Sequence, residues 1–594
     1  MRRSSALALA LFLTGSVAAF GAGMVTVTTT AASGPGSLAD AISQANSGAC
    51  GSNCTIKFDV AGTFATSGFT ITAAGLSIDG YSAPGASPNH GGFPQPNDAT
   101  ITVNIVPNGS VNTAFKIQAN GVTIDGVGIT GFASDAVVID GTTGSAGQNT
   151  VSGCVITNNG GGVRIQGAQA TNNLVGTGRP ATNPVGGSGT GRPADRNVIG
   201  NNANYDVLII DASNNGVAGC NLGVAGNGTS ALPSPKGVWI TGNSSTNAVG
   251  GTSPGNTNLI GGHTEGIRVD GVTGTLINGN WIGVNINGTG AVANTTGIHV
   301  VNGGNSTSIG ALRANVISGN TTGVLVESST GTVTIQGNLI GTDINGVGAI
   351  ANSGDGIQTL GSNGNVVIQN NTVAFNGGNG VEPGGTGVQI RANAIYGNAG
   401  RAINLTGGAA PVNDVGDGDT GNDNLQNYPN PSTIRIVSGV LMFDATVDSS
   451  FTANGSMAID VFKADANGQA RTYLGTTGCV AGNSLTLYPV SIPTGLIVAG
   501  DSIVTTTTTY ANGSCTSAGD GTSELSPAAL TCAAPPAVFS APPFVCANST
   551  NNVVSVGATS GAAYTWTVTN GTLTGGQGTS SITFTAGPSG NTIV

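Results

Sequence analysis

The chain has 594 residues, of which 100 are glycine and only 7% are charged, and its formal net charge is −11 at pH 7. Ordinary globular proteins carry about 25% charged residues, so neutral polar side chains must make up most of this surface. The negative balance excludes electrostatic binding of nucleic acid or of anionic lipid. A hydrophobic fraction of 38%, with apolar residues recurring regularly, argues against a disordered linker.

Residues 1–22 predict a secretory signal peptide. Met1-Arg2-Arg3 precede an apolar run at 6–19, and small residues suited to cleavage lie near 18–22. The run is shorter than a membrane span needs, and no other stretch of 18 apolar residues occurs. We therefore expect a secreted or cell-surface protein without a membrane span.

The eight cysteines fit an oxidising compartment. The natural disulfide pairs by position are Cys50 with Cys54, Cys479 with Cys515, and Cys532 with Cys546. Cys154 and Cys220 are either bonded or buried as small apolar residues. Connectivity cannot be fixed from sequence alone.

Residues 34–47, GPGSLADAISQANS, predict a short helix near the N-terminus. Ser37 and Asp40 form a capping-box pattern at its start. Its apolar residues fall on one face: Leu38, Ala41, Ile42 and Ala45. Because the first coil of a stacked array must be covered, we interpret this helix as an N-terminal cap.

The middle of the chain is a repeat. The stretch NLIGTDINGVGAIANSGDGIQTL begins at Asn338, and near-copies begin at Asn221 and Asn280. A second motif, interleaved with the first, begins at Asn197, Asn258 and Asn315. The shared period of about 60 residues indicates a stacked array.

Within each unit, short apolar runs alternate with polar residues, as at 332–335, which predicts β-strands rather than helices. Two motifs in each unit predict two coils, the second widened by a loop at 343–352, where Asn345 and Gly346 fit a turn. Strands of this length bury an apolar face only by stacking in parallel. Asparagines at matching places in successive coils are expected to hydrogen-bond to one another along the stack.

Two insertions interrupt the early coils. The loop at 81–98 is rich in Pro, Gly and Asn and is expected to project from the stack. The insertion at 176–196 carries most of the clustered positive charge of the chain: Arg179, Arg192 and Arg196.

Three segments together carry a family resemblance. GSLADAISQAN, LSIDGYSAPGASPN from Leu76, and the alternation of NVISGN with GNLIGTDINGVGAIAN resemble secreted bacterial right-handed parallel β-helix repeat proteins of the pectin-lyase-like fold. The resemblance spans about residues 25–431. It implies a right-handed coil, three parallel sheets and an extracellular or surface location. It does not settle activity, because this fold hosts lyases, hydrolases, epimerases, adhesins and stalks.

The predicted fold is therefore all-β, a right-handed parallel β-helix solenoid followed by Ig-like β-sandwich modules. Strands lengthen after Ser432, and the stretch closing in GTSELSP resembles an Ig-like sandwich. Trp566 and the GGQGT segment resemble a PKD-like Ig domain, with Trp566 as its core tryptophan. The expected order is signal peptide 1–22, β-helix with capping helix 25–411, acidic linker 412–431, Ig-like sandwich 432–530, Pro-rich linker 531–545, and an incomplete PKD-like domain 546–594.

The acidic linker contains the sharpest local cluster of chemistry-bearing residues. Acidic side chains alternate with glycine between residues 413 and 423, similar to part of a calcium-binding loop. The predicted ligands of a structural calcium ion are Asp414, Asp417, Asp419 and Asp423. The alternative is a solvated linker in which Asp and Gly form turns.

No complete catalytic constellation of the enzymes that use this fold is present. Polygalacturonase-like hydrolysis needs paired aspartates, a histidine and a basic pair. The chain has no Asp-Asp pair, no Gly-His-Gly and no Arg-x-Lys. The three histidines, His90, His263 and His299, lie in dissimilar contexts.

One charged group is dense enough to consider as a lyase site, where carboxylates hold Ca²⁺ and an arginine acts as base. Glu265, Arg268 and Asp270 alternate around a strand predicted at 266–269. Asp206 is placed on a neighbouring coil, with Asp211 nearby. The alternative is a solvated charged face without catalysis.

The leading hypothesis is a secreted or cell-surface, non-catalytic β-helix protein with an adhesive, matrix or spacer role. Its expected partners are an extracellular polysaccharide or a cell-surface component. Aromatic residues total 4%, and Trp239 and Trp281 are scattered, so a row of sugar-stacking rings is not evident. The alternative function is a polysaccharide lyase or glycoside hydrolase acting on acidic polysaccharide.

Overall fold

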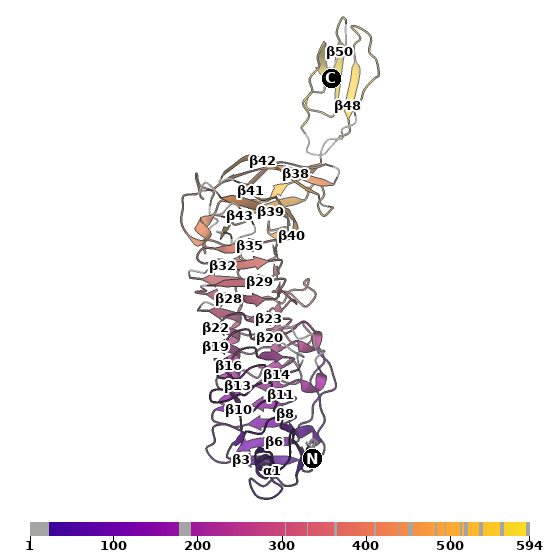
Figure 1. The fold of residues 1–594 in the computed structure, drawn as a ribbon. Coiled ribbons are helices and arrows are strands. Elements are labelled where there is room, and N and C mark those ends of the chain that lie inside the picture. Colours follow the sequence, from indigo (N-terminus) through magenta and orange to yellow (C-terminus); the bar gives the residue numbers. More distant parts are fainter. Residues whose placement is uncertain are drawn as a thin grey trace, which may run out of the picture.

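The computed structural model describes residues 23–177, 192–302, 305–329, 331–361, 365–408, 412–437, 439–449, 455–481, 484–493, 495–510, 514–515, 519, 521–533, 539–558 and 563–589. The predicted signal peptide and Arg179 lie outside the described residues. Figure 1 shows short strands stacked coil upon coil along one long axis, with the single described α-helix at the N-terminal end and longer strands at the other.

Each coil contributes strands to three parallel sheets. The first sheet has 13 strands in the order β1 (Met24–Val27), β2 (Thr55–Phe58), β5 (Ser77–Asp79), β8 (Thr123–Asp125), β11 (Thr150–Ser152), β14 (Leu174–Gly176), β17 (Gly216–Ala218), β20 (Ala248–Gly250), β23 (Leu276–Asn278), β26 (Thr307–Ile309), β29 (Thr332–Gln336), β32 (Asn365–Gln369) and β35 (Val388–Arg391).

The second sheet has 11 strands, namely β4 (Phe69–Ile71), β7 (Phe115–Ile117), β10 (Asp135–Asp140), β13 (Gly161–Gln166), β16 (Tyr205–Ile210), β19 (Lys236–Thr241), β22 (Glu265–Asp270), β25 (Thr296–Val301), β28 (Thr322–Glu327), β31 (Ile357–Leu360) and β34 (Val381–Glu382).

The third sheet contains β3 (Gly62–Thr66), β6 (Val103–Pro107), β9 (Gly128–Thr130), β12 (Val155–Thr157), β15 (Val198–Gly200), β18 (Asn221–Leu222), β21 (Leu259–Ile260), β24 (Trp281–Ile282), β27 (Val316–Ile317), β30 (Leu339–Ile340), β33 (Thr372–Ala374) and β36 (Ala394–Tyr396). Short 3-10 turns lie at η1 (Gly80–Ser82), η2 (Pro193–Asp195), η3 (Pro254–Asn256) and η4 (Asn422–Leu425).

Alternate residues of these strands point into one continuous apolar interior. In β22 and β25 the inward residues Ile267, Val269, Ile298 and Val300 are fully buried. Each strand pairs in parallel with the equivalent strand of the coils above and below. The three parallel sheets confirm the predicted parallel β-helix.

Asparagine ladders run along the stack, as the repeat predicted. In one ladder the side-chain amides of Asn258, Asn280, Asn315, Asn338 and Asn371 each donate to the next asparagine, at 2.9–3.0 Å. These asparagines are separated alternately by 22–23 and 33–35 residues. The two sequence motifs are therefore successive coils, one narrow and one wide. A second ladder contains Asn294, Asn320, Asn352, Asn376 and Asn398.

The alignment of Asn221 with Asn280 is wrong by one residue. Asn221 pairs with Leu259 in the third sheet, and Leu259 pairs with Trp281. Cys220 occupies the ladder position, where its backbone N–H donates to Asn258 Oδ1. The error arises because Asn-Leu and Asn-Trp look alike in sequence while the strand register is set by the apolar residues that face inward.

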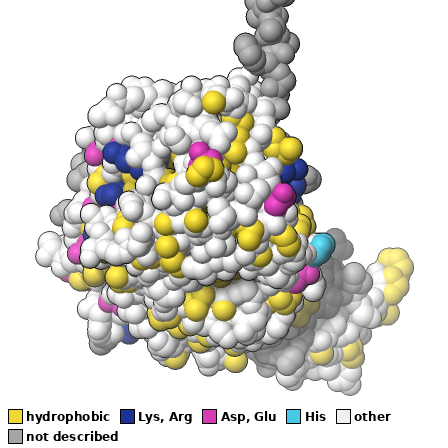
Figure 2. Space-filling model, turned by 90° about the horizontal axis from the view of Figure 1, so that it is seen from below, with side chains coloured by type: hydrophobic (Ala, Val, Ile, Leu, Met, Phe, Trp, Pro, Cys, Tyr) yellow, Lys and Arg dark blue, Asp and Glu magenta, His cyan; other side chains and the backbone are white. Residues whose placement is uncertain are grey.

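Helix α1 (Leu38–Asn46) confirms the predicted cap. The Ser37 side chain accepts a hydrogen bond from the Asp40 backbone N–H, and the four predicted apolar residues are all buried. The helix lies over the first coil beside β1 and β4. Viewed from this end, the surface is mostly neutral, with isolated charged side chains (Figure 2).

The loop at 81–98 does not project, contrary to expectation. The Phe93 ring packs edge-on against the Trp281 ring, with ring centroids 4.6 Å apart. The Arg196 guanidinium lies over the Phe93 ring. The Arg196 guanidinium donates to Gln95 O at 2.7 Å. Covering the Trp281 ring removes apolar surface from water, which holds the loop along the coils.

The β-helix continues directly into a β-sandwich. β36 pairs antiparallel with β40 (Ala470–Thr476), which belongs with β39 (Ser456–Ala464), β41 (Val480–Ala481), β43 (Ser502–Tyr510), β44 (Gly521–Thr522) and β45 (Ala529–Leu530). The facing sheet is β42 (Ser484–Pro493), β38 (Val440–Asp448), β37 (Asn430–Val437) and β46 (Cys532–Ala533). Apolar residues from both sheets, including Phe443 and Ile459, form its core.

A small C-terminal module (yellow in Figure 1) contains one antiparallel sheet, in the order β47 (Phe539–Ser540), β48 (Asn552–Val556), β50 (Ser581–Ala586) and β49 (Gly571–Gly575). Trp566 is half-buried against its small apolar core, and its indole N–H donates to Thr579 O at 2.8 Å.

Two predicted disulfides are present, Cys50–Cys54 and Cys479–Cys515. Cys154 and Cys220 are buried free thiols. Cys546 is free and exposed, so its predicted pairing with Cys532 is wrong. Cys532 lies in a strand of the sandwich, whereas Cys546 belongs to the following module. Among the described residues, no helix is long and apolar enough to cross a membrane.

Candidate functional site

The outer face of the second sheet carries a cluster of polar and aromatic side chains. Trp239, Arg268 and His299 occupy the same register position on the neighbouring strands β19, β22 and β25. We call the surrounding set the central cluster: Lys236, Trp239, Glu265, Arg268, Asp270, His299 and Glu327. Because adjacent coils are one inter-strand spacing apart, about 4.8 Å, these side chains form a continuous surface along the helix axis.

Arg268 is fixed between two carboxylates. Its Nη1 donates to Glu265 Oε1 at 2.7 Å, and its Nη2 donates to Asp270 Oδ2 at 3.1 Å. Partial burial opposes the charge, but the hydrogen bonds and charges of the two carboxylates outweigh it and raise the pKa of Arg268 above its usual value. A base must give up its proton readily, so this arrangement disfavours Arg268 as the base of a lyase.

His299 lies between Glu265 and Glu327. Its Nδ1 is 2.5 Å from Glu265 Oε1, and its Nε2 is 3.1 Å from Glu327 Oε2. Burial of Glu265 favours its neutral form, but hydrogen bonds from His299 and Arg268 outweigh burial and lower the pKa of Glu265 to about 2. Glu265 is therefore ionised and engaged at neutral pH.

An aromatic edge borders the charged part of the cluster. Lys236 Nζ lies 4.9 Å from the Trp239 ring centroid and 3.8 Å from Glu265 Oε2. The Tyr205 ring lies beside Trp239, with centroids 6.4 Å apart. Ring faces beside hydrogen-bonding groups suit a ligand that has both apolar and hydroxyl surfaces.

Asp206 does not reach this surface. Its side chain is fully buried, with Oδ2 at 2.9 Å from His263 Nε2 and Oδ1 accepting from Ser234 Oγ at 2.7 Å. Neighbouring coils have glycines at the equivalent position, such as Gly237 and Gly266. Asp206 therefore links coils inside the wall. Asp211 is exposed just beyond β16 and accepts from the Asn243 backbone N–H.

Among the described residues, other cationic side chains on the outer face of the second sheet are also paired with carboxylates. Lys116 Nζ is 2.8 Å from Asp140 Oδ2, and Arg164 Nη2 is 2.7 Å from Asp135 Oδ2. The face thus offers hydrogen-bonding groups held in place by one another rather than a row of unpaired positive charges. It fits a hydroxyl-rich ligand better than a purely anionic one.

The sequence missed His299, Glu327 and Lys236 as members of this cluster. The signal was present in the repeat: GVWI, GIRV, GIHV and GVLV begin at 237, 266, 297 and 323. Aligning their third residues places Trp239, Arg268 and His299 in one column. Composition alone could not show this, because the column depends on stacking.

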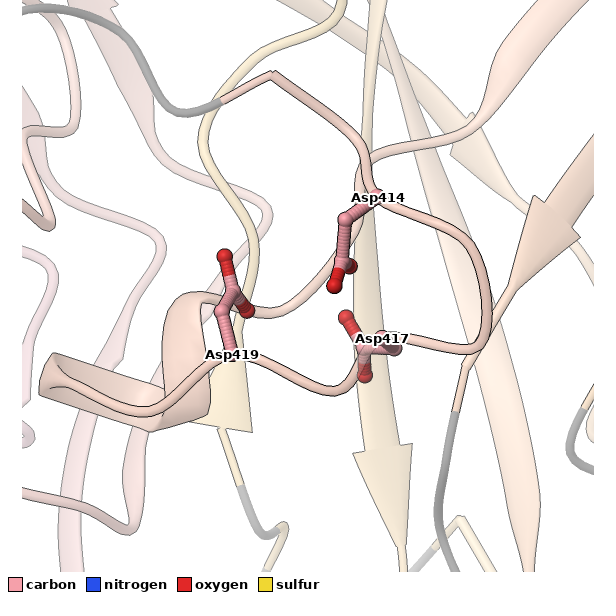
Figure 3. Close-up of side chains that lie close together, drawn as sticks. All are labelled: Asp414, Asp417 and Asp419. Carbon is pink, nitrogen blue, oxygen red and sulfur yellow. The ribbon is translucent and has the colours of Figure 1, made fainter.

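Three of the four predicted calcium ligands lie together. Carboxylate oxygens of Asp414, Asp417 and Asp419 lie within 4.8 Å of one another, and their side chains point toward one another from one loop (Figure 3). Partial burial and the neighbouring charge of Asp414 raise the pKa of Asp419. Asp417 Oδ1 accepts from the Asn427 backbone N–H at 2.8 Å.

Asp423 is placed elsewhere. It is buried at the junction, where its carboxylate accepts from the backbone N–H groups of Val388 at 3.0 Å and Thr522 at 3.3 Å. Burial outweighs these hydrogen bonds and raises the pKa of Asp423 to about 8.

Comparison with known proteins gives one domain match. Residues 532–594 match the family model of a PKD-like domain. No curated protein matches the chain.

Two solved structures are distantly similar in fold. The A-module of a mannuronan C-5 epimerase from Azotobacter vinelandii has 14% identity and a TM-score of 0.36, covering 64% of this chain and 95% of its own. The enzymatically active domain of a tailspike protein from bacteriophage CBA120 has 11% identity and a TM-score of 0.31, covering 80% of this chain and 72% of its own.

The parallel sheets, their register and the asparagine ladders define the class of this protein: it is a parallel β-helix protein. Its β-helix is followed by a β-sandwich and a C-terminal PKD-like domain.

Proposed function

We propose that this protein is an extracellular, non-catalytic β-helix stalk that binds polysaccharide along the outer face of its second sheet. The observation that carries the proposal is the column of Trp239, Arg268 and His299 on neighbouring strands. An extended glycan lying along the axis would meet an aromatic ring and then hydrogen-bonding side chains on successive coils. Aromatic stacking with polar contacts is a recurring mode of recognition for ligands of this kind.

The non-catalytic part of the proposal is supported by the state of the central cluster. Arg268 is held protonated by Glu265 and Asp270, and Asp206 is sealed inside the wall. The cluster therefore lacks the unengaged base that a lyase requires. The spacer role is supported by the continuous parallel sheets and the asparagine ladders, which resist bending of the stack.

The extracellular location is supported by the two disulfides, which persist in oxidising compartments. It also rests on the signal peptide predicted from the sequence. The alternative is a polysaccharide lyase or glycoside hydrolase, which would produce new reducing or unsaturated ends when incubated with its polymer.

The test is affinity electrophoresis of the intact protein in gels containing pectin, alginate or a neutral glucan, with a parallel assay for new reducing or unsaturated ends. We expect retardation by at least one polymer without new ends. Trp239→Ala should weaken the affinity for that polymer about tenfold, which corresponds to about 1.4 kcal/mol of binding free energy. Gln358→Ala, in the same column beyond the cluster, is the control and should bind normally.

Equal retardation of wild type and Trp239→Ala would show that the face is not the binding site. New chain ends that vanish in Arg268→Ala would overturn the non-catalytic assignment in favour of the enzyme. Absence of retardation by every polymer would count against polysaccharide binding itself.

A further inference from the structure

A second candidate site lies away from the central cluster, where the last coil meets the sandwich. An open cleft of about 580 Å³ is lined by the end of the β-helix, the turn between β39 and β40, and the segment after β44. Clefts of this size at the junction of two structural units are common ligand sites. The residues that matter to its chemistry are Arg401, Ile403, Tyr428, Asn467, Glu524 and Leu525.

The walls of this cleft are held by hydrogen bonds between the two units. Gln469 Oε1 accepts from the Asn398 backbone N–H at 3.0 Å, and Gln469 Nε2 donates to Gly400 O at 2.9 Å. Glu524 Oε1 accepts from the Leu405 backbone N–H at 2.9 Å. A cleft whose walls are fixed before binding costs little ordering free energy when a ligand enters.

Several polar groups in the cleft have unused hydrogen-bonding capacity. Arg401 Nη1 donates to Glu524 Oε2 at 2.6 Å, which uses one of the five N–H groups of a guanidinium. Within the described part of the chain, neither the Tyr428 hydroxyl nor the Asn467 side-chain amide makes a hydrogen bond; the contacts of these residues are through their backbones. Arg401 and Tyr428 are half-buried and Asn467 is exposed, so a ligand in the cleft can reach them.

The charge in the cleft is balanced, because the Arg401 guanidinium is paired with the Glu524 carboxylate. Half-buried Leu525 and the Tyr428 ring add apolar surface next to these polar groups. A ligand that matches this combination is uncharged, bears several hydroxyls that both donate and accept, and presents C–H faces to the apolar wall.

We propose that this cleft is a binding site for a neutral sugar of one or two pyranose rings. The Arg401–Glu524 pair, the Asn467 amide and the Tyr428 hydroxyl bind the hydroxyl groups of the sugar, and the Tyr428 ring packs against a sugar face. This site is separate from the outer face of the second sheet. It does not depend on polysaccharide binding there.

The test is saturation-transfer NMR and calorimetric titration of the intact protein with glucose, galactose, mannose, lactose and cellobiose, and with glucuronate as the charged comparator. We expect at least one neutral sugar to bind, and glucuronate to bind more weakly, because its carboxylate would lose water without gaining an unpaired cation: Arg401 is already paired with Glu524. Asn467→Ala and Tyr428→Phe should each weaken binding about fivefold, the effect of one lost hydrogen bond. Both changes leave the fold intact, since Asn467 is exposed in a turn and Phe keeps the ring.

Tyr396→Phe is the matched control, because it removes a tyrosine hydroxyl that bonds to Gly346 O outside the cleft. It should bind sugar as wild type does. Trp239→Ala should also bind these sugars normally, which separates this site from the proposed polysaccharide surface. The proposal is overturned if none of the sugars binds, or if Asn467→Ala and Tyr428→Phe bind as tightly as wild type. If the polymers retard the protein but no small sugar binds, the proposed polysaccharide-binding function is kept and the proposed sugar site in the cleft is rejected.

Discussion

Arg391, the last residue of β35, and Asp460 of β39 form a two-point ion pair that joins the β-helix to the sandwich. Arg391 Nε lies 2.7 Å from Asp460 Oδ2, and Nη2 lies 2.8 Å from Oδ1. The Asp460 side chain is fully buried, and the Tyr510 hydroxyl also contacts the guanidinium. Burial opposes the charge of Arg391, but its bonds with Asp460 raise its pKa above the usual value. The junction is therefore a fixed joint rather than a flexible linker.

Removing Arg391 should destabilise the junction strongly. Arg391→Met leaves the Asp460 carboxylate buried without its cation, which costs about 3–5 kcal/mol. Chemical denaturation followed by circular dichroism measures the loss. Lys463→Met is the control, because Lys463 pairs with Asp501 at the surface, where both side chains keep contact with solvent, and surface pairs contribute about 0–1 kcal/mol. Similar losses in the two variants would contradict the fixed joint.

Interrupting a ladder should also lower stability. Asn315 Nδ2 donates to Asn338 Oδ1 and to Ile277 O, and its Oδ1 accepts from the Asn280 backbone N–H. Asn315→Ala leaves these buried groups unpaired, at about 1–3 kcal/mol for each group. Asn287→Ala, at an exposed position in a hairpin turn, should change the free energy of unfolding by less than about 0.5 kcal/mol. Equal effects would mean that the ladder contributes no stability.

The carboxylate of Glu265 in the central cluster should make the protein less stable as the pH falls into the acidic range. Because the folded-state pKa of Glu265 is lowered from 4.5 to about 2, its contribution is complete above pH 4.5 and is lost as the pH falls toward 2. Denaturation midpoints measured across this range should drop more steeply in wild type than in Glu265→Gln. Parallel curves would show that the carboxylate is not held by His299 and Arg268.

The carboxyl group of Asp423 should have the opposite effect on the pH dependence of stability. Its folded-state pKa is raised from 3.8 to about 8, so its contribution is complete below pH 3.8 and is lost as the pH rises through 8. Wild type should lose stability progressively between about pH 4 and pH 8, and Asp423→Asn should be flatter over that range. Identical slopes would place the titration on another group.

Local patterns predicted the parts of this fold that depend on neighbouring residues. Ser37 with Asp40 identified the helix start, and the asparagine spacing identified alternating narrow and wide coils. The helix cap depends on residues three apart in the chain, and the asparagine contacts repeat from coil to coil, so both signals are present in the sequence itself. The placement of Tyr428 and Asn467 across the junction could not be predicted, because it depends on how the sandwich docks.

Two of the errors, at Asp206 and at Phe93, have a common physical origin in contacts made between coils. Asp206 was expected on a charged surface, yet it pairs with His263, 57 residues away, inside the wall. Phe93 was expected on a projecting loop, yet it covers Trp281. Each outcome is decided by which side chain of another coil is within reach, and neither coil's own sequence contains that information.

The calcium hypothesis from the sequence can be tested at Asp414, Asp417 and Asp419. If the ion binds the folded loop alone, calcium at about one hundred times its dissociation constant adds about 2.7 kcal/mol to the free energy of unfolding. Wild type should then melt at a higher temperature in calcium than in chelator. Asp417→Asn/Asp419→Asn should melt at the same temperature in both, because two of the converging carboxylates are gone.

Asp59→Asn, which removes an exposed carboxylate at a distant coil, is the control and should keep the full calcium response. Magnesium should substitute poorly, because it demands a smaller and more regular set of oxygen ligands than this loop provides. If chelator leaves the wild-type melting temperature unchanged, the hypothesis that this loop binds calcium is rejected. The cluster would then be explained by the turn geometry of Asp and Gly alone.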